Sequence, residues 1–379
     1  MSGGGALSPV HPGRLATAAV RSLSPYVPGK PIGELEREYG VRDIAKLASN
    51  ENPYGPSPRA LEAMHAALSE AWLYPDASAH EFKAVLARHL GVASSQITVG
   101  NGSNELLLLL AEAFLDADRS AVCSQYGFAI YPLVIRATGA RCIETPALPA
   151  DAPMPYGHDL AAMAAAVAAD TRLLFIADPN NPTGTWVDRA SLRALLRALP
   201  GDTIAVLDEA YFEYANVDGG IDDCVGWLPE FPNLVVLRTF SKGYGLAGVR
   251  VGYAVSHPEV ADALNRIRPA FNVSNVAQAG AAAAIADQAY MLDGARRIVA
   301  ERERVAGALR ALRVDCAPSA ANFLMADLGE RAPQIYEQLL RGGLIVRPLG
   351  GYGLPRHLRV SIGLPEQNER LLAQLRALR

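Results

Sequence analysis

Short apolar runs alternate with amphipathic segments of about 10–15 residues from residue 95 to residue 255. The expected strands are Gln96–Val99, Ala121–Ser124, Arg141–Thr145, Leu173–Ala177, Thr203–Leu207, Leu234–Arg238 and Val249–Val255. The expected helices between them are Asn104–Phe114, Ile130–Thr138, His158–Ala169 and Arg189–Leu199. This alternation predicts an α/β fold with a mostly parallel, doubly wound sheet of seven strands and helices on both faces.

The pattern changes on either side of this region. After Pro269 come the long Ala- and Arg-rich segments Ala277–Met291 and Gly294–Leu312, followed by further strand-like pieces. The first 45 residues are rich in Gly, Pro and Ser, and only Ile32–Tyr39 is helix-like. At 379 residues the chain is long enough for two or three units. We therefore predict an N-terminal arm (1–45) packing with the small domain, a large domain (46–270) and a small α+β domain (271–379).

Composition excludes several classes of protein. Half of the residues are hydrophobic and a fifth are charged, which supports a large core rather than disorder. The net charge of −4 gives no electrostatic reason to bind nucleic acid or an anionic membrane. No apolar run reaches the roughly 18 residues of a membrane span, and no secretory signal is evident. The four cysteines lie far apart with no metal-like spacing, so we expect no metal and a reducing cytoplasm.

Lysine is rare in this chain. Only four of its 35 basic residues are lysines. Lys242 follows the expected strand Leu234–Arg238 and enters a glycine-rich loop, so it should lie at the carboxyl edge of the sheet, where open α/β sheets bind ligands. A single lysine is usually a solvated surface charge, yet arginine cannot replace an amine nucleophile.

Three more polar segments follow expected strands. Asp208 ends one strand with Tyr211 three residues on, and Asn181 lies in the tight turn Asp178–Gly184. Ser103 and Asn104 open a helix, whose free amides and dipole suit a phosphate. Each segment alone has an ordinary structural explanation as a helix cap or a turn. Together, an amine, a carboxylate and a phosphate cradle at one sheet edge are what pyridoxal phosphate (PLP) requires.

One tempting motif does not fit its context. Gly243–Gly248 spells G-x-G-x-x-G, but the segment after it, Val249–Val255, is strand-like. The dinucleotide fingerprint needs a helix to open directly after its glycines. A nicotinamide-dependent dehydrogenase is therefore a disfavoured alternative.

The polar segments resemble those of a known family. The order of motifs is that of class I and II aminotransferases of PLP fold type I, and within them the chain is similar to the histidinol-phosphate aminotransferases from about Ser24 to the C-terminus. The motifs that carry this resemblance are Leu47–Pro56, Tyr74–Asp76, Asn181–Gly184, Asp208–Tyr211, Arg238–Lys242, Leu246–Tyr253 and Arg359–Gly363.

The resemblance implies roles around the cofactor ring. Lys242 would be the Schiff-base lysine and the acid/base that moves the proton from Cα. Asp208 would pair with the pyridine nitrogen, while Asn181 and Tyr211 would bond the phenolic oxygen. Tyr126 would stack on the ring.

The resemblance also implies phosphate and substrate contacts. The cofactor phosphate would be held by Ser241, Arg250, the amides at Ser103 and Asn104, and Tyr74 of the partner subunit in a homodimer with shared active sites. The substrate anions would meet Tyr26, Arg347 and Arg359. Two positions depart from the family pattern, since Gln125 replaces a usual proline and Asn104 a common aspartate.

The implied function is a cytoplasmic step of histidine biosynthesis. L-Histidinol phosphate and 2-oxoglutarate would give imidazole-acetol phosphate and L-glutamate. The main alternative is an aromatic amino acid aminotransferase of the same fold that accepts phenylalanine or tyrosine, and a threonine-phosphate decarboxylase is a weaker one. A non-catalytic regulator of this fold would usually append a basic DNA-binding domain, for which the acidic chain has only a short arm.

Overall fold

A seven-stranded sheet forms the centre of the computed structural model, which describes residues 11–25 and 29–378. Its strand order is β2 (Ile97–Gly100), β8 (Gly252–Val255), β7 (Leu234–Thr239), β6 (Ile204–Asp208), β5 (Thr171–Ala177), β3 (Ser120–Ser124) and β4 (Arg141–Thr145). Only β8 runs antiparallel to its neighbours, β2 and β7, while the other pairs are parallel. The expected mostly parallel α/β sheet is confirmed.

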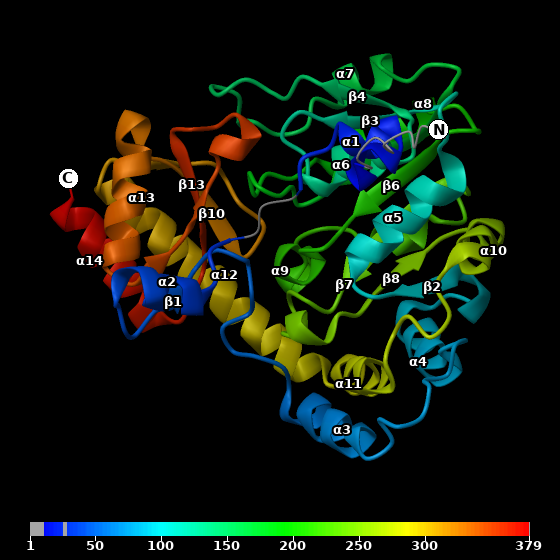
Figure 1. Ribbon diagram of the computed structural model, residues 1–379, viewed down its shortest axis with the longest axis horizontal. Helices are drawn as coiled ribbons and strands as arrows, with labels where there is room; N and C mark the ends of the chain where they lie inside the picture. The colour runs from blue at the N-terminus through cyan, green and yellow to red at the C-terminus, as the bar shows by residue number, and fades with distance from the viewer. Residues whose placement is uncertain (1–10, 26–28, 379) are drawn as a thin grey trace, which may run out of the picture.

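Helices bury both faces of this sheet (Figure 1). Along β7, Val235 and Leu237 face one core cluster, while Leu234 and Val236 face the other, as the two-residue period of a strand requires. The first cluster includes α5 (Ser103–Phe114), α6 (Ile130–Ala137) and α10 (Pro258–Ile267). The second includes α7 (Leu160–Ala165) and α8 (Arg189–Ala198).

Register aligns the carboxyl ends of the central strands. Ala177 of β5 pairs with Asp208 of β6, and Asp208 pairs with Leu237 of β7. The chain segments that leave these three strands therefore start side by side at one edge. The short helix α9 (Phe212–Ala215) follows β6 at this edge.

A second, antiparallel sheet is built from the C-terminal part of the chain. Its order is β12 (Arg347–Pro348), β13 (His357–Ser361), β10 (Phe323–Asp327) and β9 (Asp315–Cys316). It lies with α13 (Ala332–Arg341) and α14 (Pro365–Ala377) at one side of the molecule, and the long helix α12 (Gln288–Ala311) leads into it (Figure 1).

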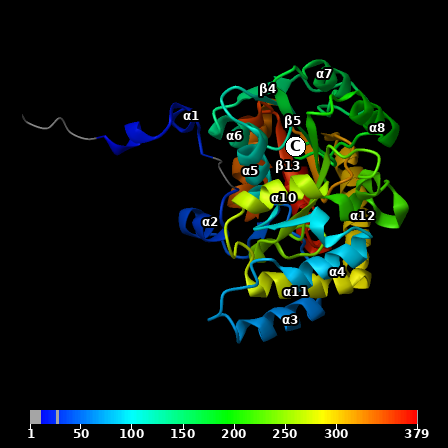
Figure 2. The same ribbon diagram turned by 90° about the vertical axis from the view of Figure 1, so that its right-hand side faces the viewer.

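The N-terminal region joins this C-terminal part. β1 (Ala45–Lys46) pairs in parallel with β11 (Leu344–Ile345), and Leu35 of α2 (Ile32–Tyr39) packs in a small cluster with Leu340 and Ile345. Farther upstream, η1 (Pro12–Leu15) and α1 (Ala18–Arg21) extend to one side of the molecule (Figure 2).

A helical layer formed by α3 (Pro58–Leu68), α4 (His80–Leu90) and α11 (Asn275–Ala286) covers the β2 side of the molecule (Figure 1). Gly280 permits the close approach of α3 to α11, since a Cβ there would lie 2.6 Å from Met64 Cγ. Among the described residues, no helix is both long and apolar enough to cross a bilayer.

Four elements differ from expectation in their bounds. The helix expected at His158–Ala169 is the shorter α7, which starts where Asp159 caps Ala162 N at 2.9 Å. The break between α11 and α12 falls at Asp287, a residue type that favours turns, rather than before Gly294. β8 starts only at Gly252, because Arg250 adopts a left-handed conformation with φ of 60°.

Candidate active site

A cavity of about 310 Å³ opens at the carboxyl edge of the central sheet. Its wall combines the loop after β1, the start of α5, the segments after β5, β6 and β7, and two arginines of the second sheet. The expected site residues in this wall are Ser103, Asn104, Asn181, Asp208, Tyr211, Ser241, Lys242, Arg250, Arg347 and Arg359.

The amine of Lys242 is held in the cavity wall by the main chain. Its Nζ donates to the carbonyl oxygen of Ser49 at 3.0 Å. Burial, followed by the positive charge of Arg359, lowers the pKa of Lys242 to about 7 against the opposing effect of Glu51. A large share of this amine is therefore neutral at neutral pH, as a nucleophile or a base must be.

Asp208 is a buried carboxylate with one engaged and one open oxygen. It is 4% exposed, and its Oδ2 accepts a hydrogen bond from the Tyr131 hydroxyl at 2.9 Å. Oδ1 has no hydrogen-bond partner among the described residues. Burial raises the pKa of Asp208 to about 6, and the bond from Tyr131 opposes this rise. An open, buried oxygen in the cavity wall suits a cationic N–H such as that of a protonated pyridine.

Tyr211 and Asn181 occupy the wall between Lys242 and the second sheet. The hydroxyl of Tyr211 accepts a hydrogen bond from Asn50 Nδ2 at 2.9 Å, and burial raises its pKa to about 12. Oδ1 of Asn181 accepts from Nη1 of Arg359, whose Nη2 donates to the carbonyl of Ala48 at 2.6 Å. These side chains present hydrogen-bond donors to a ligand in the cavity.

An anion cradle lies at the start of α5. Gly102 has φ of +77°, and a Cβ there would come within 2.2 Å of Nη2 of Arg250. Nη1 of Arg250 donates to Ser241 Oγ at 3.1 Å. The cradle thus joins the N-terminal amides of a helix, at Ser103, with a guanidinium and a hydroxyl, a donor set that fits a phosphate.

Two expected residues, Tyr126 and Tyr74, do not line this cavity. Tyr126 packs edge-on against Tyr156, with ring centroids 5.6 Å apart, and Phe128 lines the cavity instead. Tyr74 is 82% exposed and stacks on Phe271 at 4.6 Å. Tyr26 lies outside the described residues. The roles expected of Tyr126, Tyr74 and Tyr26 stay predictions.

Sequence reasoning assigned no role to several residues around the cavity. Ser49 and Asn50 belong to the motif Leu47–Pro56, which was used only for the resemblance. Asn50 takes a left-handed conformation (φ of 55°), and its backbone N–H donates to Ser361 Oγ at 2.9 Å. Tyr131 gave no signal, because a tyrosine within an apolar helix reads as a core residue.

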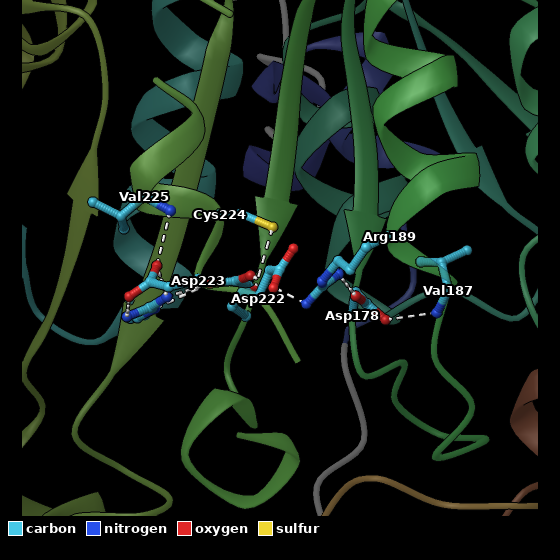
Figure 3. Close-up of polar contacts among 9 residues, drawn as sticks. Asp178, Val187, Arg189, Asp222, Asp223, Cys224 and Val225 are labelled. Carbon is cyan, nitrogen blue, oxygen red and sulfur yellow. Dashed lines mark hydrogen bonds and ion pairs between the residues drawn. The ribbon is translucent and has the colours of Figure 1, made fainter. Parts of the chain in front are cut away.

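A buried ionic network lies next to the site and links the ends of three strands (Figure 3). Asp178 accepts from Arg189 and from the backbone N–H of Val187 at 2.9 Å. Oε2 of Glu209 accepts hydrogen bonds from Nε and Nη2 of Arg238, at 3.0 and 2.7 Å. Since Asp178, Glu209 and Arg238 belong to the β5, β6 and β7 ends that also lead to Asn181, Asp208 and Lys242, the network fixes the spacing of the cavity wall.

The fold and this site define a class of protein, and comparison with known proteins identifies it. The chain belongs to the class I and II aminotransferase family, whose profile matches residues 42–375. The resemblance read from the motifs is thereby confirmed.

Individual relatives are more specific. The chain is 51% identical over 361 residues to histidinol-phosphate aminotransferase 2 of Methylococcus capsulatus, covering 95% of this chain and 97% of that protein. It is 48% identical over 362 residues to histidinol-phosphate aminotransferase 1 of Nitrosococcus oceani, covering 96% of each. The structure of histidinol-phosphate aminotransferase from Sinorhizobium meliloti, in complex with pyridoxal-5'-phosphate, matches with a TM-score of 0.84 and 33% identity over 96% of this chain and 98% of that one.

Proposed function

We propose that this aminotransferase uses PLP to transfer the amino group of L-histidinol phosphate to 2-oxoglutarate, giving imidazole-acetol phosphate and L-glutamate. The observation that carries the proposal is the convergence, in one cavity, of a buried amine, an open carboxylate oxygen and a phosphate cradle. Full-length relatives at about half identity carry the same activity in their names. They favour this reading over aromatic transamination.

The residues of the cavity fit the cofactor. Lys242 Nζ would hold it covalently and Asp208 Oδ1 would face its ring nitrogen, while Arg250, Ser241 and the amides at Ser103 and Asn104 would hold its phosphate. Asn181 and Tyr211 would bond its phenolic oxygen. When bound, PLP supplies an electron sink for the charge that develops at the substrate Cα.

Proton transfer falls to Lys242. Its Nζ is the neutral amine in the wall, and a pKa of about 7 lets it both take the Cα proton and release it again near neutral pH. The Ser49 carbonyl holds the amine when it is not covalently engaged. Catalysis that needs the neutral amine is expected to rise with pH through about 7.

Two arginines support a substrate with an anionic group. Arg359 and Arg347 pair across β13 and β12 and both line the cavity. A guanidinium fork binds either phosphate or carboxylate, as exchange between histidinol phosphate and glutamate requires. Tyr26 of the arm is proposed to join them.

Assembly as a homodimer with shared sites completes the proposal. Four large apolar side chains are exposed together around the loop after α3, namely Trp72, Leu73, Tyr74 and Phe271. Trp72 is 81% and Tyr74 82% exposed, more than a lone chain in water favours for adjacent aromatic rings. A second copy would cover this patch and receive Tyr74 at its cofactor phosphate. The cytoplasm and the division at residues 45 and 270 belong to the same proposal.

Addition of L-histidinol phosphate to the purified PLP-loaded protein, with no keto acid present, tests the function directly. Loss of the visible cofactor absorbance, with the band of the aminated cofactor appearing in proportion, is the expected result. A protein that ignores histidinol phosphate but responds to phenylalanine would be an aromatic aminotransferase. Failure to bind PLP at all would exclude the proposal.

A further inference from the structure

Tyr131 reaches the catalytic carboxylate from the helix that covers the sheet. It lies on α6, is wholly buried, and donates its hydroxyl to Oδ2 of Asp208 at 2.9 Å. Its ring stacks on Phe175 of β5, with centroids 5.1 Å apart and planes at 17°. Phe128 packs edge-on against the same Tyr131 ring, with centroids 5.8 Å apart. The hydroxyl is thus aimed by packing on two sides.

The bond can have only one direction at neutral pH. Burial, followed by the charge of Asp208, raises the pKa of Tyr131 well above its usual value, so Tyr131 keeps its proton and donates. For Asp208, burial raises the pKa, while the bond from Tyr131 and then the backbone N–H of Ala210 lower it; by charge, Glu209 raises the pKa and Lys242 lowers it. Tyr131 is therefore a neutral side-chain donor to Asp208, and the backbone N–H of Ala210 is a second neutral donor.

Occupation of Oδ2 leaves Oδ1 as the oxygen that faces the cavity. A carboxylate with both oxygens open could rotate between two arrangements, whereas one engaged oxygen fixes the plane of the group. The bond also favours the charged form that a protonated ring nitrogen requires.

We propose that Tyr131 is a positioning residue for the cofactor: it orients Asp208 and keeps it ionised, so that Oδ1 receives the pyridinium N–H of PLP. This inference rests on the proposed use of PLP and adds a residue that acts through Asp208 without touching the cofactor. It differs from a purely structural role because its loss acts on PLP binding and on the pH at which PLP binds.

The test compares Tyr131→Phe with Tyr244→Phe in apoprotein titrated with PLP. Both changes delete one hydroxyl of a buried tyrosine and keep the ring; the hydroxyl of Tyr244 accepts a hydrogen bond from Nε2 of Gln288 at 3.2 Å, away from Asp208. Tyr131→Phe is expected to raise the dissociation constant for PLP by about tenfold or more, as for a lost bond to a charged group. The midpoint below which PLP binding weakens should move to higher pH than in the wild type, and Tyr244→Phe should move neither quantity.

Replacement of Tyr131 by 3,5-difluorotyrosine gives a second, independent measurement. This residue is a stronger donor of nearly the same size, so the pH midpoint should move downward while it remains protonated. Unchanged affinity and midpoint in either folded Tyr131 variant would overturn the inference. A wild-type protein that does not bind PLP would instead refute the proposed function, so the two failures are distinguishable.

Discussion

Burial in the cavity wall sets the chemistry of single residues in this protein. Lys242 and Asp208 lie in the same wall, and burial moves the pKa of the amine down to about 7 and that of the carboxyl up to about 6. The pKa values of a basic and an acidic group are thereby both brought into the pH range in which an enzyme works. The rarity of lysine in the sequence directed attention to the first of them, and the strand end to the second.

Lys242→Ala is expected to lower the rate of transamination by at least about a thousandfold, because the amine both binds the cofactor and carries the Cα proton. The measurement is turnover of histidinol phosphate by the PLP-loaded variant. Lys83→Ala is the control, since Lys83 is a half-buried lysine whose pKa burial also lowers, but it lies on α4 and does not line the cavity. Wild-type turnover by Lys242→Ala would contradict the role.

Glu213 should make the stability of the protein depend on pH. Burial raises its pKa to about 7, and one carboxylate oxygen has no partner among the described residues. A raised folded-state pKa means that its contribution is fully present below about 4.5 and is lost as pH rises through about 7. The difference in free energy of unfolding between Glu213→Gln and the wild type is therefore expected to shift in favour of the variant on going from pH 4.5 to pH 8. The expected shift is on the order of 2 kcal/mol.

Denaturant unfolding of the two proteins at both pH values measures this difference. Glu36→Gln, at an exposed glutamate of α2, controls for the loss of one carboxylate. A gain for Glu213→Gln that is equal at both pH values would show that the buried carboxyl does not titrate as expected.

At the scale of elements, the turn into α5 carries the phosphate cradle. Gly102→Ala is expected to weaken PLP affinity by about tenfold or more, because the new methyl group displaces the Arg250 guanidinium. Gly139→Ala is a matched control: it imposes a similar backbone penalty (φ of +88°), but its Cβ would meet only Ala117, at 3.9 Å. Titration of both apoproteins with PLP gives the comparison. Equal affinities of the two variants would show that the cradle does not bind the cofactor phosphate.

The order of strands and helices could be predicted from the sequence because each element buries a complete periodic pattern of apolar residues. The strands of the central sheet were all expected near their observed positions, since runs such as Leu234–Arg238 alternate between two buried faces. The reversed direction of β8 could not be predicted, because strand direction depends on the loop before it. There the left-handed Arg250 turns the chain back into the sheet.

The site contacts that could not be predicted from the sequence join segments that are far apart along the chain. Asn50 reaches Tyr211, and Tyr131 reaches Asp208, across long stretches of chain that no local pattern connects. The expected position of Tyr126 over the ring came from the resemblance alone, and its ring packs on Tyr156 in the described structure.

For the whole molecule, shared active sites predict complementation between two inactive variants. Co-expressed Lys242→Ala and Tyr74→Ala chains should form mixed dimers in which one site has both residues intact, restoring up to about a quarter of wild-type activity. The control pairs Lys242→Ala with Asp208→Asn, which belong to the same wall of one chain and should restore nothing. Activity equal to the mean of the two parent proteins would exclude a shared site.

The pairing of β1 with β11 has a consequence for synthesis on the ribosome. This pair joins Ala45 to Leu344, and the segment directly after β1 supplies Ser49 and Asn50 to the cavity. Asn50 is further held by Ser361, near the end of the chain. The central sheet can form while the last hundred or so residues are still being translated, but the pocket cannot. A nascent chain therefore carries a folded nucleus without a complete cofactor site until its final strand has emerged.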